Sequence, residues 1–171
     1  MLPENTSRLA FRQLTLNDVD NLQTIFSDPI AMEYYPATKS MEETKAWINW
    51  CIESYSKHGH GLWAVSLKES GIFIGQCGII HHTFRGTPDK EIVYLFQRQH
   101  WHKGYATEAA MACKEHAFKT MHFAKVVSFI DPANEPSSNV AKRIGMQLEG
   151  ISRPEQNRWK KILHVYSATN G

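Results

Sequence analysis

The 171-residue chain is long enough to bury roughly 70% of the surface that its unfolded form exposes, which is ample for one folded domain. Its 19 Lys and Arg residues nearly balance its 17 Asp and Glu residues, which leaves a net charge of +2. This balance argues against a protein that coats nucleic acid and against an acidic disordered segment. We therefore expect a single domain over residues 1–171 that has no nucleic-acid partner.

The three cysteines, Cys51, Cys77 and Cys113, are widely spaced and form no CxxC pair. An odd count at such spacing is not typical of a disulfide framework or a zinc ribbon, so we expect reduced thiols and a cytoplasmic location. The first residues contain no apolar stretch typical of a signal peptide, and no apolar run approaches 18 residues. The sequence thus predicts no membrane partner.

The first third of the chain predicts a strand and two helices. Residues 9–14 are expected to form a short strand, and Thr15 with Asp18 three positions later is typical of a helix start. This helix should end before Pro29, which disfavours a helical residue in front of it. Ser40 or Thr38 is expected to cap the second helix, which should end near residues 57–59.

From residue 62 the hydrophobic period changes from helical to alternating, which indicates strands. Residues 62–68 and 72–81 should pair around a turn at 69–71, and residues 91–97 form a third strong strand. Gly75 and Gly78 inside the second of these strands predict a bulge or a close approach of backbones.

A polar turn at residues 98–104 then leads into a helix with a small-residue face, followed by a strand at 125–130. A short helix that ends at Gly145 and two strands, 147–152 and 162–167, complete the chain. The resulting order, β-α-α-β-β-β-α-β-α-β-β, predicts a mixed α/β fold and not a doubly wound sheet.

The turn before the third helix indicates an anion site. A helix N-terminus presents unpaired backbone N–H groups and a partial positive charge. Gly104 and the small Ala106 would let a phosphate approach these amides, and Lys103 adds a cation. The sequence contains neither GxxxxGK[ST] nor GxGxxG, so a P-loop and a dinucleotide fingerprint are both absent. A phosphorylated cofactor of another kind is therefore expected.

The segment Trp101-His-Lys-Gly-Tyr-Ala-Thr-Glu-Ala resembles the pyrophosphate loop of the GNAT N-acetyltransferases. It is most similar to the branch of the RimJ/RimL ribosomal-protein alanine acetyltransferases, as is the helix from Asn134 to Gly145 with the strand after it. The resemblance implies a mixed, mostly antiparallel sheet of six to seven strands flanked by about four helices. It also implies acetyl-CoA as co-substrate, and no metal.

Carried over by position, the resemblance assigns residues to the cofactor. Two strand residues, Leu95 and Phe96, would pair their backbone with the pantetheine arm between diverging strands, and Asn134 would touch that arm. The backbone amides of the loop would hold the pyrophosphate: His102, Lys103, Gly104, Tyr105 and Ala106. The sequence departs from the branch's pattern at His102, which replaces a glycine, and at Met146, which replaces the usual phenylalanine. Ala141 replaces a tyrosine that acts as an acid in other branches.

Acetyl transfer to an amine needs a base for the ammonium and a proton for the leaving thiolate. Glu91 on the central strand is the first candidate base, although it could instead pair with Lys90 or Arg98. His81 and His82 are the second choice, and only one of them can face a given site. Ser137 is the candidate acid, and its alternative role is in capping a helix. A metal held by histidines is not indicated, because no carboxylate or cysteine completes a ligand set.

Acceptor-binding residues are expected where the family builds its pocket. Tyr34 and Tyr35 could form a wall before Pro36, with His81 nearby, although core packing would explain the aromatics equally well. The charge run that begins at Arg158 could attract an acidic acceptor.

The first expectation for the acceptor is a protein N-terminal α-amine. A small amine such as a polyamine, amino acid or drug-like compound is the rival, and a non-catalytic acyl-CoA binder is a further alternative. A monomer or a homodimer is expected.

Overall fold

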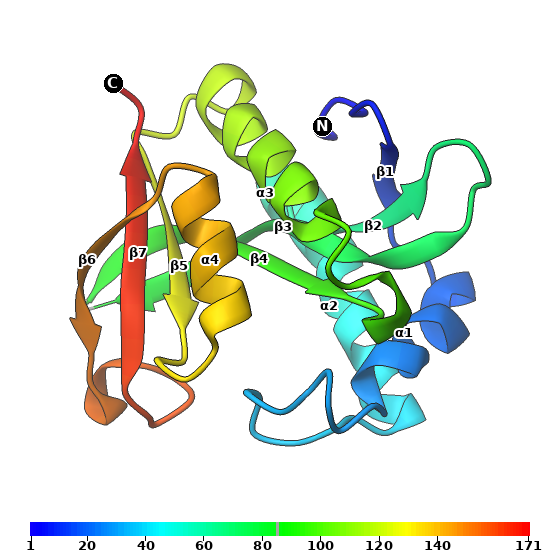
Figure 1. The fold of residues 1–171 in the computed structure, drawn as a ribbon, viewed down its shortest axis with the longest axis horizontal. Helices are drawn as coiled ribbons and strands as arrows, with labels where there is room; N and C mark the ends of the chain where they lie inside the picture. Colours follow the sequence, from blue (N-terminus) through cyan, green and yellow to red (C-terminus); the bar gives the residue numbers. More distant parts are fainter. Residues whose placement is uncertain (85) are drawn as a thin grey trace.

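The computed structural model describes residues 1–84 and 86–171, which are built around one seven-stranded sheet (Figure 1). The strands lie in the order β1-β2-β3-β4-β5-β7-β6, and within the described residues β4 and β5 are the one neighbouring pair that runs parallel. The strands are β1 (Leu9–Gln13), β2 (Leu62–Leu67), β3 (Phe73–Phe84), β4 (Thr87–Phe96), β5 (Lys125–Ile130), β6 (Gln147–Ser152) and β7 (Leu163–Thr169). The helices are α1 (Val19–Phe26), α2 (Met41–His58), α3 (Tyr105–Glu115) and α4 (Glu135–Arg143). The predicted order of elements is confirmed.

The helices cover both faces of the sheet. In Figure 1, α3 and α4 lie over the near face, and α1 and α2 lie behind it. Helix α3 lies close on the central strands because Ala109, Ala110 and Cys113, which face inward, are small and fully buried. No helix in the described part of the chain is both long and apolar enough to cross a bilayer.

The ends of α2 follow the predicted chemistry. The Glu43 N–H donates to Ser40 Oγ (3.2 Å), and the Ser40 N–H donates back to Glu43 Oε2 (2.7 Å). Ser40, and not Thr38, is therefore the cap residue. At the other end, Gly59 adopts the left-handed conformation (φ 74°) that closes many helices. These two signals set the ends of α2, and the segment before it joins α1 to α2 as a loop.

The hairpin of β3 and β4 is longer than predicted. The sequence placed the strand ends at His81 and Glu91, whereas the ladder continues through His81↔Lys90 and His82↔Asp89. The sequence predicts that the strands end where the apolar alternation stops. Backbone pairing does not depend on side-chain polarity, so the two strands continue through the polar residues beyond that point. The extension has a consequence for the site, because His82 and Glu91 now lie diagonally across adjacent strands on one face.

The predicted close approach at Gly78 is confirmed. A β-carbon at this position would lie 2.0 Å from the Gly61 carbonyl oxygen, and one at Gly75 would lie 2.5 Å from the Leu95 carbonyl oxygen. Only glycine allows the neighbouring strands to come this close. The ladder of β2 and β3 is also irregular between Val65 and Ser66, so both predicted features occur there.

The opening between β4 and β5 is the feature of the sheet that creates a site. These strands share a single paired position, Glu91↔Val127, and then diverge (Figure 1). Beyond that point, Ser128 bridges them by donating its hydroxyl to the Ile92 carbonyl (2.8 Å). The divergence leaves one edge of β4 without a partner strand over its last residues, as the resemblance implied.

His60 links the end of α2 to β3 and is 1% exposed. Its Nδ1 lies 2.8 Å from the Ile79 carbonyl oxygen, so the neutral ring can donate there. Burial has the largest effect on the pKa of this imidazole and lowers it, and the nearby charges of His81, Lys90 and His58 lower it further. Together they lower the pKa of His60 to about 4.

Acid is therefore expected to destabilise the protein between about pH 6.5 and pH 4, because the unfolded chain binds a proton to this histidine and the folded chain does not. Chemical unfolding at pH 7 and pH 5 measures the effect. We expect the free energy of unfolding of His60→Asn, which keeps an N–H donor, to depend less on pH than the wild type's by up to about 2 kcal/mol. Equal pH dependence of both proteins would contradict this role for His60.

Candidate active site

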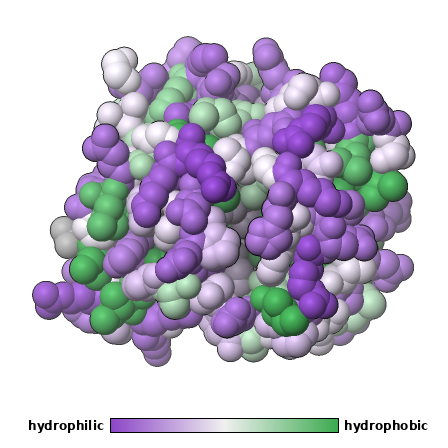
Figure 2. All heavy atoms as spheres, viewed as in Figure 1, coloured by the Kyte–Doolittle hydropathy of each residue, from purple (hydrophilic) through white to green (hydrophobic). Residues whose placement is uncertain are grey.

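A cavity of about 430 Å³ lies over the divergence of β4 and β5. Its floor is formed by the two strands, and its walls are formed by the loop between α1 and α2, the start of α4 and the loop between β6 and β7. Figure 2 shows that this face of the molecule is hollowed near its middle and bordered mainly by hydrophilic residues. The residues that line the cavity include Tyr34, Tyr35, Glu91, Tyr94, Leu95, Asp131, Asn134, Ser137, Arg158, Trp159 and Lys161.

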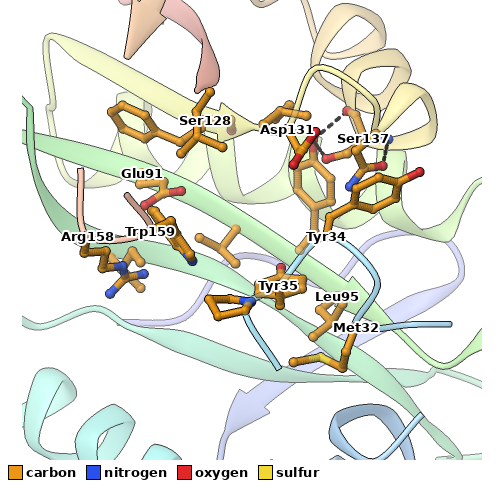
Figure 3. Close-up of a pocket in the computed structure, with 18 of the residues that line it drawn as sticks. Met32, Tyr34, Tyr35, Glu91, Leu95, Ser128, Asp131, Ser137, Arg158 and Trp159 are labelled. Atoms are coloured by element: carbon orange, nitrogen blue, oxygen red, sulfur yellow. Dashed lines mark hydrogen bonds between the residues drawn. The ribbon is translucent and has the colours of Figure 1, made fainter. Parts of the chain in front are cut away.

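One end of the cavity holds a buried carboxylate. Glu91 is 3% exposed, and its Oε2 lies 3.1 Å from Nδ1 of His82. In Figure 3 the Glu91 carboxylate lies beside Trp159, with Arg158 next to it. Burial raises the pKa of Tyr35 to about 12, the negative charge of Glu91 adds to the rise, and the charge of Arg158 opposes it. Tyr35 therefore lies near both the Glu91 carboxylate and the Arg158 guanidinium at this end of the cavity.

The other end holds two hydroxyl groups in contact. Ser137 Oγ donates to the Tyr94 hydroxyl (3.1 Å), which itself donates to the Ser137 carbonyl oxygen (2.8 Å). Burial raises the pKa of Tyr94, the Ser137 hydrogen bond opposes the rise, and nearby Glu91 adds to it, so the phenol stays protonated. Asn134 Oδ1 accepts from the Ser137 N–H (3.1 Å) and so caps α4. These contacts fix the position of the Ser137 hydroxyl.

The turn before α3 has the properties of an anion site. Among the described residues, no hydrogen bond involves the backbone N–H groups of residues 102–107 as donors. His102 (φ 60°) and Gly104 (φ 79°) take left-handed conformations. A β-carbon on Gly104 would meet only the Arg8 guanidinium, at 3.4 Å. The backbone thus offers a run of free donors that a diphosphate fits, and His102 adopts the bend without a glycine.

The N-terminal segment supports this turn from outside. Arg8 donates to the Lys103 carbonyl oxygen (3.0 Å) and lies 4.7 Å from the ring centre of Tyr105. It also pairs with Glu108, which accepts further hydrogen bonds from the Thr6 hydroxyl (2.6 Å) and the Arg8 N–H (3.1 Å). The first turn of α3 is therefore anchored through Glu108 while its leading amides stay free.

A lysine joins the two loops above the cavity. Lys161 Nζ donates to the Tyr34 carbonyl oxygen (2.9 Å) and to Asp131 Oδ2 (2.9 Å). Burial acts against ionisation of Asp131, but the Lys161 hydrogen bond and the Ala133 N–H outweigh it and lower the pKa of this carboxyl group. The loop after α1, the end of β5 and the loop after β6 are thereby held together.

The structure brings most of the predicted site residues together. Glu91, Leu95, Asn134, Ser137, Tyr34 and Tyr35 all line the cavity, and residues 102–106 form the turn beyond the end of β4. Phe96 does not line the cavity, because its side chain is buried in the core. Its carbonyl oxygen accepts from the Trp101 indole N–H (2.9 Å).

The placement of His81 in the acceptor pocket was wrong. Strand alternation turns His81 to the opposite face, where it lies 4.0 Å from His58 between ring centres and 2.8 Å from Lys90 Nζ. Its neighbour His82 is the histidine that faces the site, next to Glu91. The expected alternative that Glu91 pairs with Lys90 or Arg98 does not occur either, because Lys90 contacts His81 and Arg98 pairs with Asp28.

Sequence reasoning missed Tyr94 as a functional residue. Its alternation with Ile92 and Phe96 indicates only one face of a strand, and nothing in the sequence near Tyr94 links it to the helix that carries Ala141. The structure shows a phenol from β4 against the first turn of α4, while Ala141 is fully buried.

No group of three His, Cys, Asp or Glu side chains within residues 1–84 and 86–171 could hold a metal ion.

Comparisons with known proteins agree with this geometry. Residues 8–147 match the family described as "Acetyltransferase (GNAT) domain". An uncharacterized Bacillus subtilis protein, YkkB, is 37% identical over 94% of this chain and 92% of its own length. A crystal structure of an acetyltransferase from Agrobacterium tumefaciens is 30% identical with a TM-score of 0.84, covering 96% of this chain and 92% of that one.

A more distant structure shares the fold alone. It is RimL, described as a ribosomal L7/L12 alpha-N-protein acetyltransferase in complex with coenzyme A, at 15% identity and a TM-score of 0.79 over 99% of this chain and 98% of that one. On the family match and the closer relatives, the chain belongs to the GNAT acetyltransferases and is an N-acetyltransferase.

The free amides of the turn give a direct test of cofactor binding. Gly104→Val should weaken coenzyme A binding at least tenfold, because a branched side chain is strained at positive φ and would displace the neighbouring amides. Calorimetric titration with coenzyme A measures this. Gly71→Val is the matched control, since Gly71 also has positive φ (70°) but lies in the turn between β2 and β3. Wild-type affinity in Gly104→Val would exclude the turn as the phosphate site.

Proposed function

We propose that this N-acetyltransferase transfers the acetyl group of acetyl-CoA directly to a primary amine, and that the acceptor is the α-amine of a protein N-terminus. The observation that carries the proposal is the single cavity with a carboxylate, Glu91, at one end and a hydroxyl pair, Ser137 and Tyr94, at the other. When bound, acetyl-CoA supplies the thioester that the amine attacks.

The candidate holders of the cofactor follow from the free backbone groups. The amides of residues 102–106 would hold the diphosphate, and the open edge of β4 between Ile92 and Phe96 would align the pantetheine arm, with the Leu95 side chain lining the same cavity. Phe96 would contribute only backbone, since its side chain is in the core. Asn134 already caps α4 through its oxygen, so its side-chain NH₂ group is the part left to contact the arm.

Glu91 is proposed to take one proton from the acceptor ammonium, directly or through one water, because only the neutral amine has a lone pair. An α-amine, with a pKa near 8, needs a weaker base than a lysine near 10.4. Over the whole reaction, one ammonium and one thioester become one amide, one thiol and one released proton. The thiolate would take its proton from Ser137, and the second proton that the attacking nitrogen loses would restore the Ser137 hydroxyl, which Tyr94 holds in place.

Glu91 and Tyr94 lie three positions apart on β4, so their side chains leave opposite faces of the strand. Both line the cavity because β4 has separated from β5 there. The base and the acid can therefore act at opposite sides of a reacting centre without touching each other. This spacing supports direct attack within a ternary complex, and a water between Glu91 and the amine would fill the remaining distance.

The second candidate acceptor is a small amine that carries an acidic group. Arg158 lines the cavity and contacts the ring of Trp159 (4.2 Å), and no carboxylate of the described residues forms an ion pair with it. A guanidinium in this position would repel a polyamine and attract a carboxylate. The same charge favours an N-terminal peptide with an acidic side chain over a basic one.

A thiol-release assay with acetyl-CoA tests the proposed function. The panel contains acidic and neutral N-terminal peptides, free amino acids and polyamines. We expect release only with an amine present, fastest with acidic N-terminal peptides, and reduced at least 100-fold in Glu91→Gln, which keeps the shape but not the charge. Coenzyme A binding without turnover across the panel would instead support a non-catalytic acyl-CoA binder.

The hydroxyl pair gives a second kinetic prediction. Tyr94→Phe and Ser137→Ala should each lower kcat about tenfold or more, and the double variant should lose little beyond the larger single effect, because the two groups act as one unit. Steady-state kinetics of the four proteins measures this. Tyr34→Phe serves as the control, since Tyr34 lines the same cavity with no hydroxyl hydrogen bond to Ser137. A loss of kcat in the double variant equal to the product of the two single losses would contradict a shared role for Tyr94 and Ser137.

A further inference from the structure

Arg8 lies directly before β1 and reaches across to the turn before α3. Its Nη1 donates to the Lys103 carbonyl oxygen (3.0 Å). Its Nε donates to Glu108 Oε2 (2.6 Å), and its Nη2 pairs with the same oxygen (2.5 Å). One planar guanidinium therefore holds a side chain in the first turn of α3 and a backbone carbonyl in the turn itself.

The hydrogen bond to Lys103 fixes the direction of one peptide group. In a trans peptide the carbonyl oxygen and the following N–H point to opposite sides, and the peptide bonds of the described chain are trans. Because the Lys103 carbonyl faces Arg8, the Gly104 N–H faces away from Arg8. Within residues 1–84 and 86–171 this N–H has no acceptor, so it is free to donate to a ligand.

Gly104 allows either orientation of this peptide. Its backbone (φ 79°, ψ 3°) has the values of the third residue of a type II turn. Turning the 103–104 peptide over gives the conformation of a type I turn, with a negative φ at the same position and a similar path of the chain. Glycine adopts both conformations at similar cost because it has no β-carbon. A contact from elsewhere must therefore select the orientation.

The two orientations present opposite charges to an anion. In the observed one, the Gly104 N–H adds to the free N–H groups at the start of α3, which favour a phosphate. In the reversed one, the Lys103 carbonyl would take the place of that N–H, and its partial negative charge would repel a diphosphate. The turn therefore suits a diphosphate in the orientation that the Arg8 hydrogen bond holds.

We propose that Arg8 is a positioning residue for acetyl-CoA: through the Lys103 carbonyl it selects the peptide orientation that presents the Gly104 N–H to the diphosphate. The inference rests on the proposed function, because it needs the diphosphate to occupy the turn at residues 102–106. It gives a part in cofactor binding to a residue 95 positions before the carbonyl that it holds.

Glu108 keeps the guanidinium in place. Its side chain is 17% exposed, and it also accepts hydrogen bonds from the Thr6 hydroxyl (2.6 Å) and the Arg8 backbone N–H (3.1 Å). Burial acts against ionisation of Glu108, but the hydrogen bonds from Thr6 and Arg8 outweigh it and lower the pKa of this carboxyl group. Glu108 is therefore a carboxylate at neutral pH and holds Arg8 as an ion pair. The Tyr105 ring, whose centre lies 4.7 Å from the guanidinium carbon, covers part of its surface.

A role by charge alone predicts a different result from a role by orientation. Any cation beside the turn would attract a diphosphate, and Arg8→Lys keeps that charge. A lysine ammonium is a compact charge without the planar set of donors, so it does not reproduce the joint contact with Lys103 and Glu108. Arg8→Lys therefore separates orientation from charge, and Arg8→Met removes both while keeping an unbranched side chain.

Arg12→Met is the matched control for the loss of an ion pair. Arg12 donates to both carboxylate oxygens of Asp18 (2.7 and 2.6 Å), and its side chain is 49% exposed, close to the 47% of Arg8. Its other partner is the Gln13 carbonyl oxygen, and neither partner belongs to the turn before α3. Thermal unfolding of each variant, measured alongside, reports any loss of fold.

Calorimetric titration with coenzyme A tests the proposal without an acceptor amine. We expect Arg8→Met and Arg8→Lys each to raise Kd at least tenfold, and Arg12→Met to match the wild type. For the best amine of the panel, KM for acetyl-CoA should rise in the Arg8 variants with kcat unchanged, because Arg8 acts on the diphosphate and not on the acetyl group.

Two binding results would overturn the proposal. Wild-type affinity in Arg8→Lys would show that charge alone matters, and wild-type affinity in Arg8→Met would show that Arg8 has no part in binding. An equal loss in Arg12→Met would also overturn it, because lower stability would then explain both losses.

Crystal structures of the free wild type and free Arg8→Met, in one crystal form, test the orientation directly. We expect the 103–104 peptide of Arg8→Met to be reversed in all or part of the molecules, with a negative φ at Gly104. A single, unreversed orientation in this variant would refute the selection by Arg8.

The outcomes also separate this proposal from the proposed function. If no amine supports thiol release but the Arg8 variants lose affinity for coenzyme A, the acetyl transfer fails and the role of Arg8 stands. If transfer occurs and the Arg8 variants bind coenzyme A normally, the role of Arg8 fails and the transfer stands. A wild type that does not bind coenzyme A would overturn both.

Discussion

The site depends on the separation of β4 from β5 after their single paired position at Glu91↔Val127. A parallel pair normally continues its ladder, so a divergence leaves backbone donors and acceptors of the inner strands unpaired. The protein fills part of this gap itself, through Ser128 on Ile92 and through Trp101 on Phe96. What is left is the open edge of β4 at Tyr94, between these two contacts and in the middle of the sheet, where an extended ligand can add as a strand does.

Two requirements meet at this opening: a carboxylate must be dry enough to act as a base, and hydroxyls must be held in place. Burial makes both costly unless neighbours compensate. The Tyr94 and Ser137 hydroxyls, 43 residues apart in sequence, are held by reciprocal hydrogen bonds, whereas Glu91 lies 3.1 Å from His82 on the same hairpin. Folding therefore assembles the hydroxyl pair, while the hairpin alone places His82 beside Glu91.

Much of the fold could be predicted from the sequence because its signals are local. The capping pair Ser40 and Glu43, the alternation in the strands and the glycines at 75 and 78 each specify their own surroundings. The turn at 102–106 was found for the same reason. The ends of β3 and β4 were misplaced because backbone pairing continued through polar residues, and strand alternation along this extension places His82, and not His81, beside Glu91. Tyr94 was missed because its partner, Ser137, is 43 residues away.

Lys161 has an implication for how acceptor preference could change in this family. Its ammonium joins the backbone at Tyr34 to Asp131, so the segments before α2 and after β6 are parts of one roof. Substitutions that change the conformation of one segment alone would break the hydrogen bonds of Lys161 to Tyr34 and Asp131 and leave Asp131 without its cation. New acceptors would therefore be reached by replacements in both segments together, and a loop transplanted singly from a relative should bring little of that relative's selectivity with it.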